Sequence, residues 1–154
     1  MKTHLKHIED SDSLIINALR CLELRLHHHS AILNNSRNVR AYLRLQLAEE
    51  ESEVFSVLFL NTQHRLLAFE KLFRGSINEA VVYPRTIVQK ALQHNAAKVI
   101  LAHNHPSDNC HPSTADKEIT EAIRKILDLI DVKVVDHVIV SRQGSYSFSE
   151  HGLL

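Results

Sequence analysis

Residues 98–106 read KVILAHNHP, a short apolar run that ends on two histidines and a proline. A continuous apolar run of this length is typical of a strand buried on both faces of a sheet. Side chains two positions apart on an extended backbone project to the same side, so His103 and His105 face one region of space. The stretch therefore predicts a central strand at residues 98–102, with two imidazoles presented just beyond its end.

A carboxylate is placed to join this pair. Ser113 and Asp116 have the spacing of a capping box, in which a serine starts a helix and an acid three residues later bonds back to it. The loop at residues 106–112 is long enough to bring Asp116 back to His103 and His105. Two imidazoles, one carboxylate and an open fourth position are the pattern of a catalytic zinc site. The sequence thus predicts one Zn²⁺ ion held by His103, His105 and Asp116. Asp116 can also be explained as the acid of the helix cap, and both roles can hold, because a capped helix start would also orient the ligand.

The other patterns predict a helical front followed by an α/β body. We expect helices at 14–26, at 37–50 after a cap at Ser36, at 84–94, and at 114–129 after Ser113. Strands are expected at 54–60, 65–73, 77–83 and 98–102, with a terminal hairpin made by 132–140 and 146–148. We divide the chain into an N-terminal helical extension, residues 1–35, and one domain, residues 36–154.

The composition of the chain bears on its binding partners and its location in the cell. The 154 residues include 18 basic and 18 acidic side chains, a balance that predicts no strong binding to nucleic acid. No apolar run reaches the roughly 20 residues of a membrane span, and the polar N-terminus does not look like a signal peptide. With only two cysteines and no export signal, we expect a cytoplasmic protein without a disulfide framework. The oligomeric state stays open.

The string HNHPS-x(5)-S-x-x-D, residues 103–116, resembles the JAMM signature of the MPN-plus metalloproteases, and the chain resembles the bacterial RadC-like proteins of that superfamily. The likeness runs through VFSVLFLN, HRLLAFEKLFRGSI, VYPRTIVQKAL, DVKVVDHVIV and YSFSEHGLL, from about residue 36 onward. It implies an α/β (α+β) fold of the MPN/JAMM, cytidine-deaminase-like type: a mixed β-sheet flanked by helices. Residues 1–35 resemble the preceding segment of the short members, and we expect the helix-hairpin-helix segment of the longer members to be absent. Residues 108–112 also depart from the family by introducing Cys110 and His111, two possible metal-binding side chains.

The resemblance also implies roles for individual residues. His103, His105 and Asp116 match the zinc ligands, and Ser113 matches a serine that helps to hold the oxyanion. Glu53, at the start of the apolar run VFSVLFL, matches the general base. The implied activity is hydrolysis of a peptide or isopeptide bond in an unidentified protein or peptide substrate. The alternative is a binding module with structural zinc, or a vestigial site, that acts through a partner in DNA repair or recombination.

Several of these assignments have simpler readings. Glu53 can be a solvated residue at the start of a strand, and Glu70 and Glu79 are close enough in sequence to compete as the base. His137, within VDHV, is expected to be a hydrogen-bonded core histidine or a supporting neighbour of the ligands, and not a ligand itself.

Overall fold

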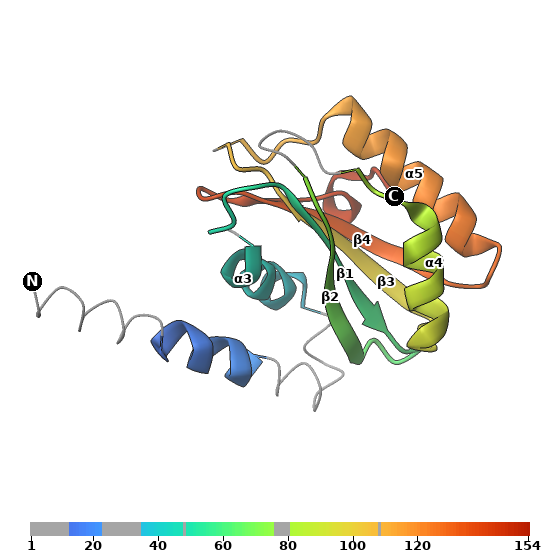
Figure 1. Cartoon of the computed structure of the whole chain (residues 1–154), viewed down its shortest axis with the longest axis horizontal. Coiled ribbons are helices and arrows are strands. Elements are labelled where there is room, and N and C mark those ends of the chain that lie inside the picture. Colours follow the sequence, from blue (N-terminus) through green and yellow to red (C-terminus); the bar gives the residue numbers. More distant parts are fainter. Residues whose placement is uncertain (1–12, 23–34, 48, 76–80, 108) are drawn as a thin grey trace, which may run out of the picture.

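A computed structural model of the chain describes residues 13–22, 35–47, 49–75, 81–107 and 109–154 (Figure 1). Within these ranges the chain forms a five-stranded mixed sheet in the order β2-β1-β3-β4-β5. The strands are β1 (Val54–Leu60), β2 (Leu66–Arg74), β3 (Lys98–Asn104), β4 (Lys133–Val140) and β5 (Ser145–Ser147). The helices are α3 (Ser36–Leu47), α4 (Pro84–Gln93) and α5 (Thr114–Asp128), with a short 3-10 turn, η1 (Ser149–His151). The expected mixed sheet flanked by helices is confirmed.

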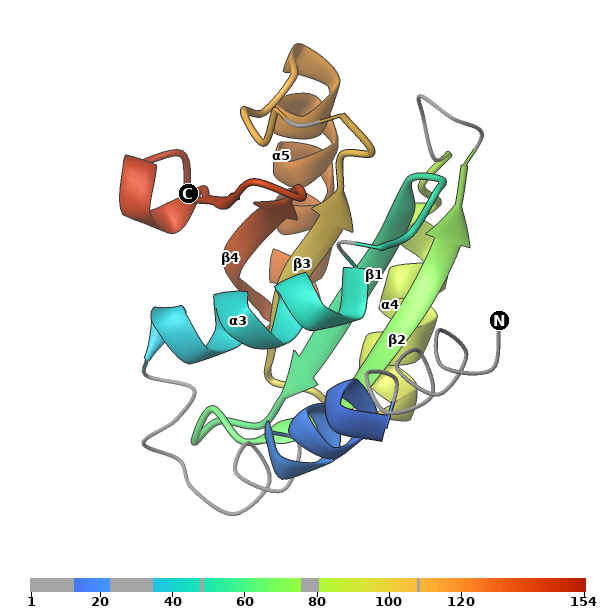
Figure 2. The same ribbon diagram turned by 90° about the vertical axis from the view of Figure 1, so that its left-hand side faces the viewer.

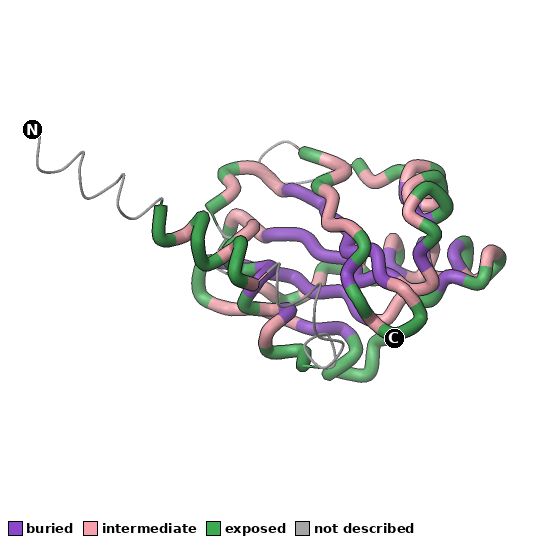
Figure 3. Tube along the Cα trace, turned by 90° about the horizontal axis from the view of Figure 1, so that it is seen from below, coloured by how far each residue is buried: buried purple, intermediate pink, exposed green. Residues whose placement is uncertain are grey.

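Helices cover the sheet on both faces. Figures 1 and 2 show α3 across one face, and α4 and α5 against the other. Two apolar clusters result, because alternate residues of a strand point to opposite faces. Leu58 joins Leu43 of α3 in the first cluster, while Val57 joins Ile123 of α5 in the second. Every residue of β1 is buried, so its unbroken apolar run reflects two covered faces. Figure 3 shows that the buried segments lie at the centre of the molecule.

The strand directions bring two segments together at one edge of the molecule. β3 runs antiparallel to β1, with His103 opposite Phe55, and parallel to β4, with His103 opposite Ile139. The carboxyl end of β3 therefore lies beside the amino end of β1. Helix α5, which connects the parallel strands β3 and β4, begins only nine residues after His105. This edge is where Glu53, His103, His105 and the start of α5 meet.

Asn104 fastens this edge. Asn104 stands between the two histidines in the sequence, and its side chain is buried. Its Oδ1 accepts a hydrogen bond of 2.7 Å from the backbone N–H of Val54. Its Nδ2 donates to the carbonyl oxygens of Glu50, at 3.3 Å, and Ser52, at 3.0 Å. One amide thus satisfies backbone groups on both sides of Glu53 and ties the segment before β1 to the end of β3.

The first helix of the domain begins one residue earlier than its sequence suggests. Asn35 is the cap, since its Oδ1 accepts from the N–H of Arg37 at 3.1 Å, and Ser36 is already helical. The Ser36 hydroxyl instead donates to Glu150 at 2.8 Å. The prediction of Ser36 as the cap was wrong, because a distant acid binds the hydroxyl. Helix α3 ends at Leu47, earlier than the expected residue 50.

Other boundaries differ in smaller ways. Residues 13–22 are helical, as expected, and residues 23–26 of that prediction lie outside the described part. β3 continues to Asn104, so His103 lies within the strand. The expected strand at 77–83 was wrong for residues 81–83, which have no ladder partner; Val82 packs against the second apolar cluster instead, and residues 77–80 are not described. The terminal hairpin turns where the N–H of Ser141 donates to the Gly144 carbonyl. In the described ranges, no helix has the length and hydrophobicity needed to cross a bilayer.

Candidate metal centre

Three side chains meet at the carboxyl end of β3. One ligand atom each from His103, His105 and Asp116 can be chosen so that all lie within 4.8 Å of one another. Nε2 of His103 lies 3.0 Å from Nε2 of His105 and 3.2 Å from Oδ1 of Asp116, and Nε2 of His105 lies 3.4 Å from Oδ2 of Asp116. Atoms bound to one tetrahedral zinc ion at about 2.0–2.2 Å are separated by roughly 3.3–3.6 Å. The three measured separations lie within a few tenths of an ångström of that range, with the two imidazoles facing different oxygens of the Asp116 carboxylate.

His105 is held by its backbone and its ring. Its N–H donates to the carbonyl of Val140 at 2.8 Å, which continues the β3–β4 pairing past the end of β3. Its Nδ1 lies 2.9 Å from the carbonyl oxygen of Asn109. Because a carbonyl can only accept, Nδ1 carries the proton, and in the neutral ring the lone pair belongs to Nε2, which faces Asp116.

A chain of hydrogen bonds sets the proton of His103 in the same way. The Thr120 hydroxyl donates to the carbonyl of Asp116 at 2.5 Å and lies 2.6 Å from Nδ1 of His137. Because the Thr120 hydroxyl gives its one proton to the Asp116 carbonyl, it can only accept from His137. Nδ1 of His137 therefore carries the proton and donates to Thr120, and Nε2 of the neutral ring is an acceptor. His103 Nδ1, 2.8 Å from His137 Nε2, therefore donates, so in the neutral ring of His103 the lone pair belongs to Nε2, the atom that faces Asp116.

Asp116 serves both the helix cap and the site. Its Oδ2 accepts from the N–H and the hydroxyl of Ser113, both at 2.7 Å, and its own N–H donates to the Ser113 hydroxyl at 3.1 Å. This capping box starts α5 and fixes the carboxylate beside the two imidazoles. The two readings of Asp116 that the sequence offered are therefore compatible.

The electrostatics favour a charged carboxylate. Burial by itself raises the pKa of Asp116, but hydrogen bonds with His103, His105 and Ser113 outweigh it and hold the pKa far below its usual range. The hydrogen bond with Asp116 in turn raises the pKa of His105, against the opposing effect of burial. Asp116 thus supplies a full negative charge to a cation at neutral pH.

Glu53 lies next to this group without joining it. It precedes β1, its negative charge helps to raise the pKa of His105, and it lines a cavity of about 230 Å³ together with Asp116. Glu70 is occupied elsewhere, in an ion pair of 2.8 Å with Lys90 and a contact with His94. Glu79 lies outside the described residues. Of the two carboxylates that can be compared, only Glu53 borders the cavity beside Asp116.

The loop residues do not join the ligand group. Among the described residues, the group that could hold a metal contains neither Cys110 nor His111. The ring of His111 packs against Tyr146, with the ring centres 5.6 Å apart.

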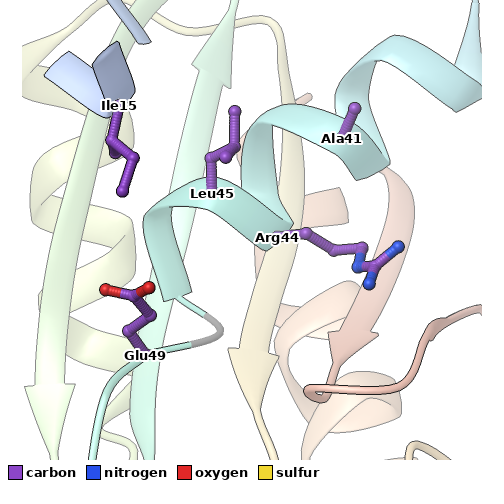
Figure 4. Close-up of a pocket in the computed structure, with 5 residues that line it drawn as sticks. All are labelled: Ile15, Ala41, Arg44, Leu45 and Glu49. Atoms are coloured by element: carbon purple, nitrogen blue, oxygen red, sulfur yellow. The ribbon is translucent and has the colours of Figure 1, made fainter. Parts of the chain in front are cut away.

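A larger cavity, of about 430 Å³, lies against α3 (Figure 4). Its lining is Ile15, Ala41, Arg44, Leu45 and Glu49, which bring no histidine and only one carboxylate. Size alone therefore does not identify the site; the chemistry lies in the smaller cavity.

Two supporting residues were not anticipated from the sequence. Thr120 follows Asp116 by one helical turn, a spacing that suggests contact but no particular role. Asn104 carries no local signal for its bonds to Glu50, Ser52 and Val54. His137, by contrast, was expected to be a hydrogen-bonded core histidine, and the structure places it in that position.

A mixed sheet with this histidine and aspartate group at one edge defines a JAB-type domain. Residues 33–153 match the RadC-like JAB domain, and the chain belongs to that family. It is 49% identical over 141 residues to UPF0758 protein YkfG of Escherichia coli (strain K12), covering 92% of this chain and 89% of the relative. It is 48% identical to UPF0758 protein YeeS of the same strain, covering 92% and 96%. A UPF0758 protein of Methylibium petroleiphilum is 53% identical over 89% of this chain, which spans 61% of that relative.

We expect His105→Ala to abolish tight binding of one metal ion per chain, because a charged aspartate and one imidazole remain. Metal analysis of protein without a purification tag, before and after the change, measures this. His94→Ala is the matched control, since His94 contacts Glu70 and not the ligand group. Full metal content in the His105 variant would place the site elsewhere.

We also expect His137→Phe to weaken metal binding by roughly 10- to 100-fold. Phenylalanine preserves the stacking on Phe148, where the ring centres lie 4.7 Å apart, but cannot accept the proton of His103. Thr120→Val should weaken binding in the same direction, whereas Thr120→Ser keeps the hydroxyl and should restore it. Competition with a chelator gives the affinities.

Nitrogen-15 spectra of the imidazoles in the metal-free protein provide an independent measurement. They should show the proton of His103 on Nδ1 in the parent and in Thr120→Ser, and a mixture of tautomers in Thr120→Val. An unchanged tautomer and affinity in Thr120→Val would remove the hydroxyl from this role.

Proposed function

We propose that the chain is a zinc-dependent hydrolase of peptide or isopeptide bonds. The observation that carries the proposal is the placement of Glu53. Of the two carboxylates at this edge, Asp116 belongs to the ligand group, while Glu53 lines the same cavity without belonging to it. That division supplies one carboxylate to hold an ion and a second to move a proton.

Zinc suits the donor set. Two imidazole nitrogens and one carboxylate oxygen are ligands that zinc accepts, and three protein ligands leave a position for substrate or water. His103, His105 and Asp116 would hold the ion, which would supply a Lewis acid able to polarise a carbonyl and to lower the pKa of water toward about 7. In their neutral forms His103 and His105 both turn an Nε2 lone pair to this position, so the ion requires no new tautomer and displaces only a proton that His105 shares with Asp116.

Glu53 accepts a proton from the attacking water and returns it to the leaving amine. Its backbone is held on both sides: the N–H of Gly75 donates to its carbonyl at 2.8 Å, and the next N–H, of Val54, binds Asn104. A base fixed in this manner keeps its carboxylate within the few ångströms over which proton transfer occurs.

Ser113 stands at the start of α5, where the helix dipole favours negative charge. Its hydroxyl has one proton, which is donated to Asp116 when no substrate is bound. A rotation about the Cβ–Oγ bond redirects that proton to a developing oxyanion, while the Ser113 N–H continues to hold Asp116. Ser113 therefore has two roles in the proposal, one toward the ligand and one toward the substrate.

A binding module with structural zinc, acting through a partner in DNA repair or recombination, is the second candidate. A structural site is usually closed by four protein ligands. The described group has three, with Glu53 beside it, which favours the enzyme. The balance of 18 basic and 18 acidic residues also gives no electrostatic drive toward nucleic acid. The partner that we propose is a protein or peptide substrate.

Glu53→Gln should keep the fold and the zinc content and lose nearly all hydrolysis, because glutamine preserves size but cannot accept a proton. The readout is turnover of a library of peptides and isopeptide-linked peptides by the zinc-loaded protein. Glu70→Gln is the matched control and should stay active, since Glu70 pairs with Lys90. Full turnover in Glu53→Gln would exclude Glu53 as the base.

Ser113→Ala separates the two roles of the serine. It removes a helix cap worth about 1 kcal/mol, a loss that a domain of this size tolerates. If the hydroxyl stabilises the oxyanion, turnover at saturating zinc should remain roughly 100-fold or more below the parent. Recovery of full turnover once zinc is saturating would restrict Ser113 to holding Asp116.

A further inference from the structure

The cavity beside the ligand group has a wall without hydrogen-bonding side chains. Apart from Glu53 and Asp116, its lining consists of Phe55, Val81, Val82, Ala115 and Ile119. Phe55 comes from the amino end of β1, the two valines from the extended segment before α4, and Ala115 and Ile119 from the first turns of α5. Three separate parts of the chain thus build one apolar surface.

Because Glu53 and Asp116 line the cavity, its apolar surface lies next to the candidate ligand group. Asp116 belongs to the ligand group, and Glu53 is the proposed base, so a substrate held at the site has its flanking residues within reach of the cavity. An acidic side chain entering the cavity meets two carboxylates and a wall that offers no donor, so both repulsion and lost hydration oppose it. A large apolar side chain leaves no polar group unsatisfied.

The size of the cavity fits one side chain. Its volume of about 230 Å³ lies below the roughly 300–1,000 Å³ of sites that enclose drug-sized ligands. That space accepts leucine, isoleucine, methionine or phenylalanine. The apolar wall is also open to a ligand, since Val81 is 64% exposed. Covering such surface on binding is favourable.

We propose that this cavity is a specificity subsite that receives a large apolar side chain flanking the scissile bond. The inference rests on the proposed hydrolase function for its use in catalysis. The apolar recognition itself is a property of the cavity and is measurable without turnover.

The first experiment is a library of quenched-fluorescent peptides and isopeptide-linked peptides, varied at the residue on each side of the bond and hydrolysed by the zinc-loaded protein. Leucine, isoleucine, methionine or phenylalanine at one flanking position should raise kcat/KM roughly 10-fold or more over glycine or aspartate. Hydrolysis without such a preference, or with a preference for lysine, would overturn the subsite.

The second experiment measures binding alone. N-acetyl-leucinamide and N-acetyl-aspartamide are titrated into zinc-loaded protein while the backbone amide signals of Val81, Val82 and Ile119 are followed by NMR. The leucine probe should shift these signals and the aspartate probe should not. If no peptide is hydrolysed but the leucine probe binds here, the subsite stands and the hydrolase proposal fails. Equal shifts with both probes, or none with either, reject the subsite.

A pair of lysine variants localises the effect. Val81→Lys places a charge on the wall of the cavity, while Leu92→Lys, on α4, changes a residue of similar exposure, 61%, that does not line it. We expect Val81→Lys to abolish the leucine-induced shifts at Val82 and Ile119, and to reduce the preference for apolar residues at least several-fold. Leu92→Lys should leave both unchanged. Equal effects of the two variants on the shifts and on the preference would show that Val81 does not contribute to apolar recognition.

Discussion

The antiparallel pairing of β1 with β3 is the constraint on which the rest of the site depends. It sets Phe55 opposite His103, and so brings the residue before β1, Glu53, to the edge where β3 ends. The side-chain amide of Asn104 then locks the segment around Glu53 to the same strand. A slip of one residue in this register would turn β1 over and send its two sets of side chains to the wrong clusters. The burial of both faces of β1 therefore also protects the position of Glu53.

Hydrogen bonds also determine which ring nitrogen of each candidate ligand histidine carries the proton. The two histidines receive fixed tautomers from different sources, a backbone carbonyl for His105 and a relay through His137 and Thr120 for His103. Among the described residues, no buried side-chain nitrogen or oxygen lacks a hydrogen-bond partner. A polar network in the core is costly when incomplete, and a complete one holds a single arrangement. The rigidity of the site is therefore a result of the same bonds that satisfy the core.

The sequence predicts some of this arrangement and not the rest, for physical reasons. The placement of His103, His105 and Asp116 follows from period-two spacing and a capping box, which are local signals. Asn35 rather than Ser36 caps α3 because Ser36 meets Glu150, 114 positions away, and no local pattern contains that contact. The apolar residues before Pro84 suggested a strand, yet an apolar side chain such as Val82 can pack against a core without joining a ladder. The boundary proposed between residues 35 and 36 stays a prediction.

The place of His137 on β4 has a consequence for biosynthesis. Glu53 and the three candidate ligands lie before residue 117, so all of them leave the ribosome ahead of the strand that orients them. A nascent chain of that length lacks the ring that sets the proton of His103 and the Val140 carbonyl that holds His105. The candidate ligand group is therefore fully oriented only when β4 has joined the sheet. A chain that is truncated or stalled before β4 therefore carries the candidate ligands without the hydrogen bonds that orient them.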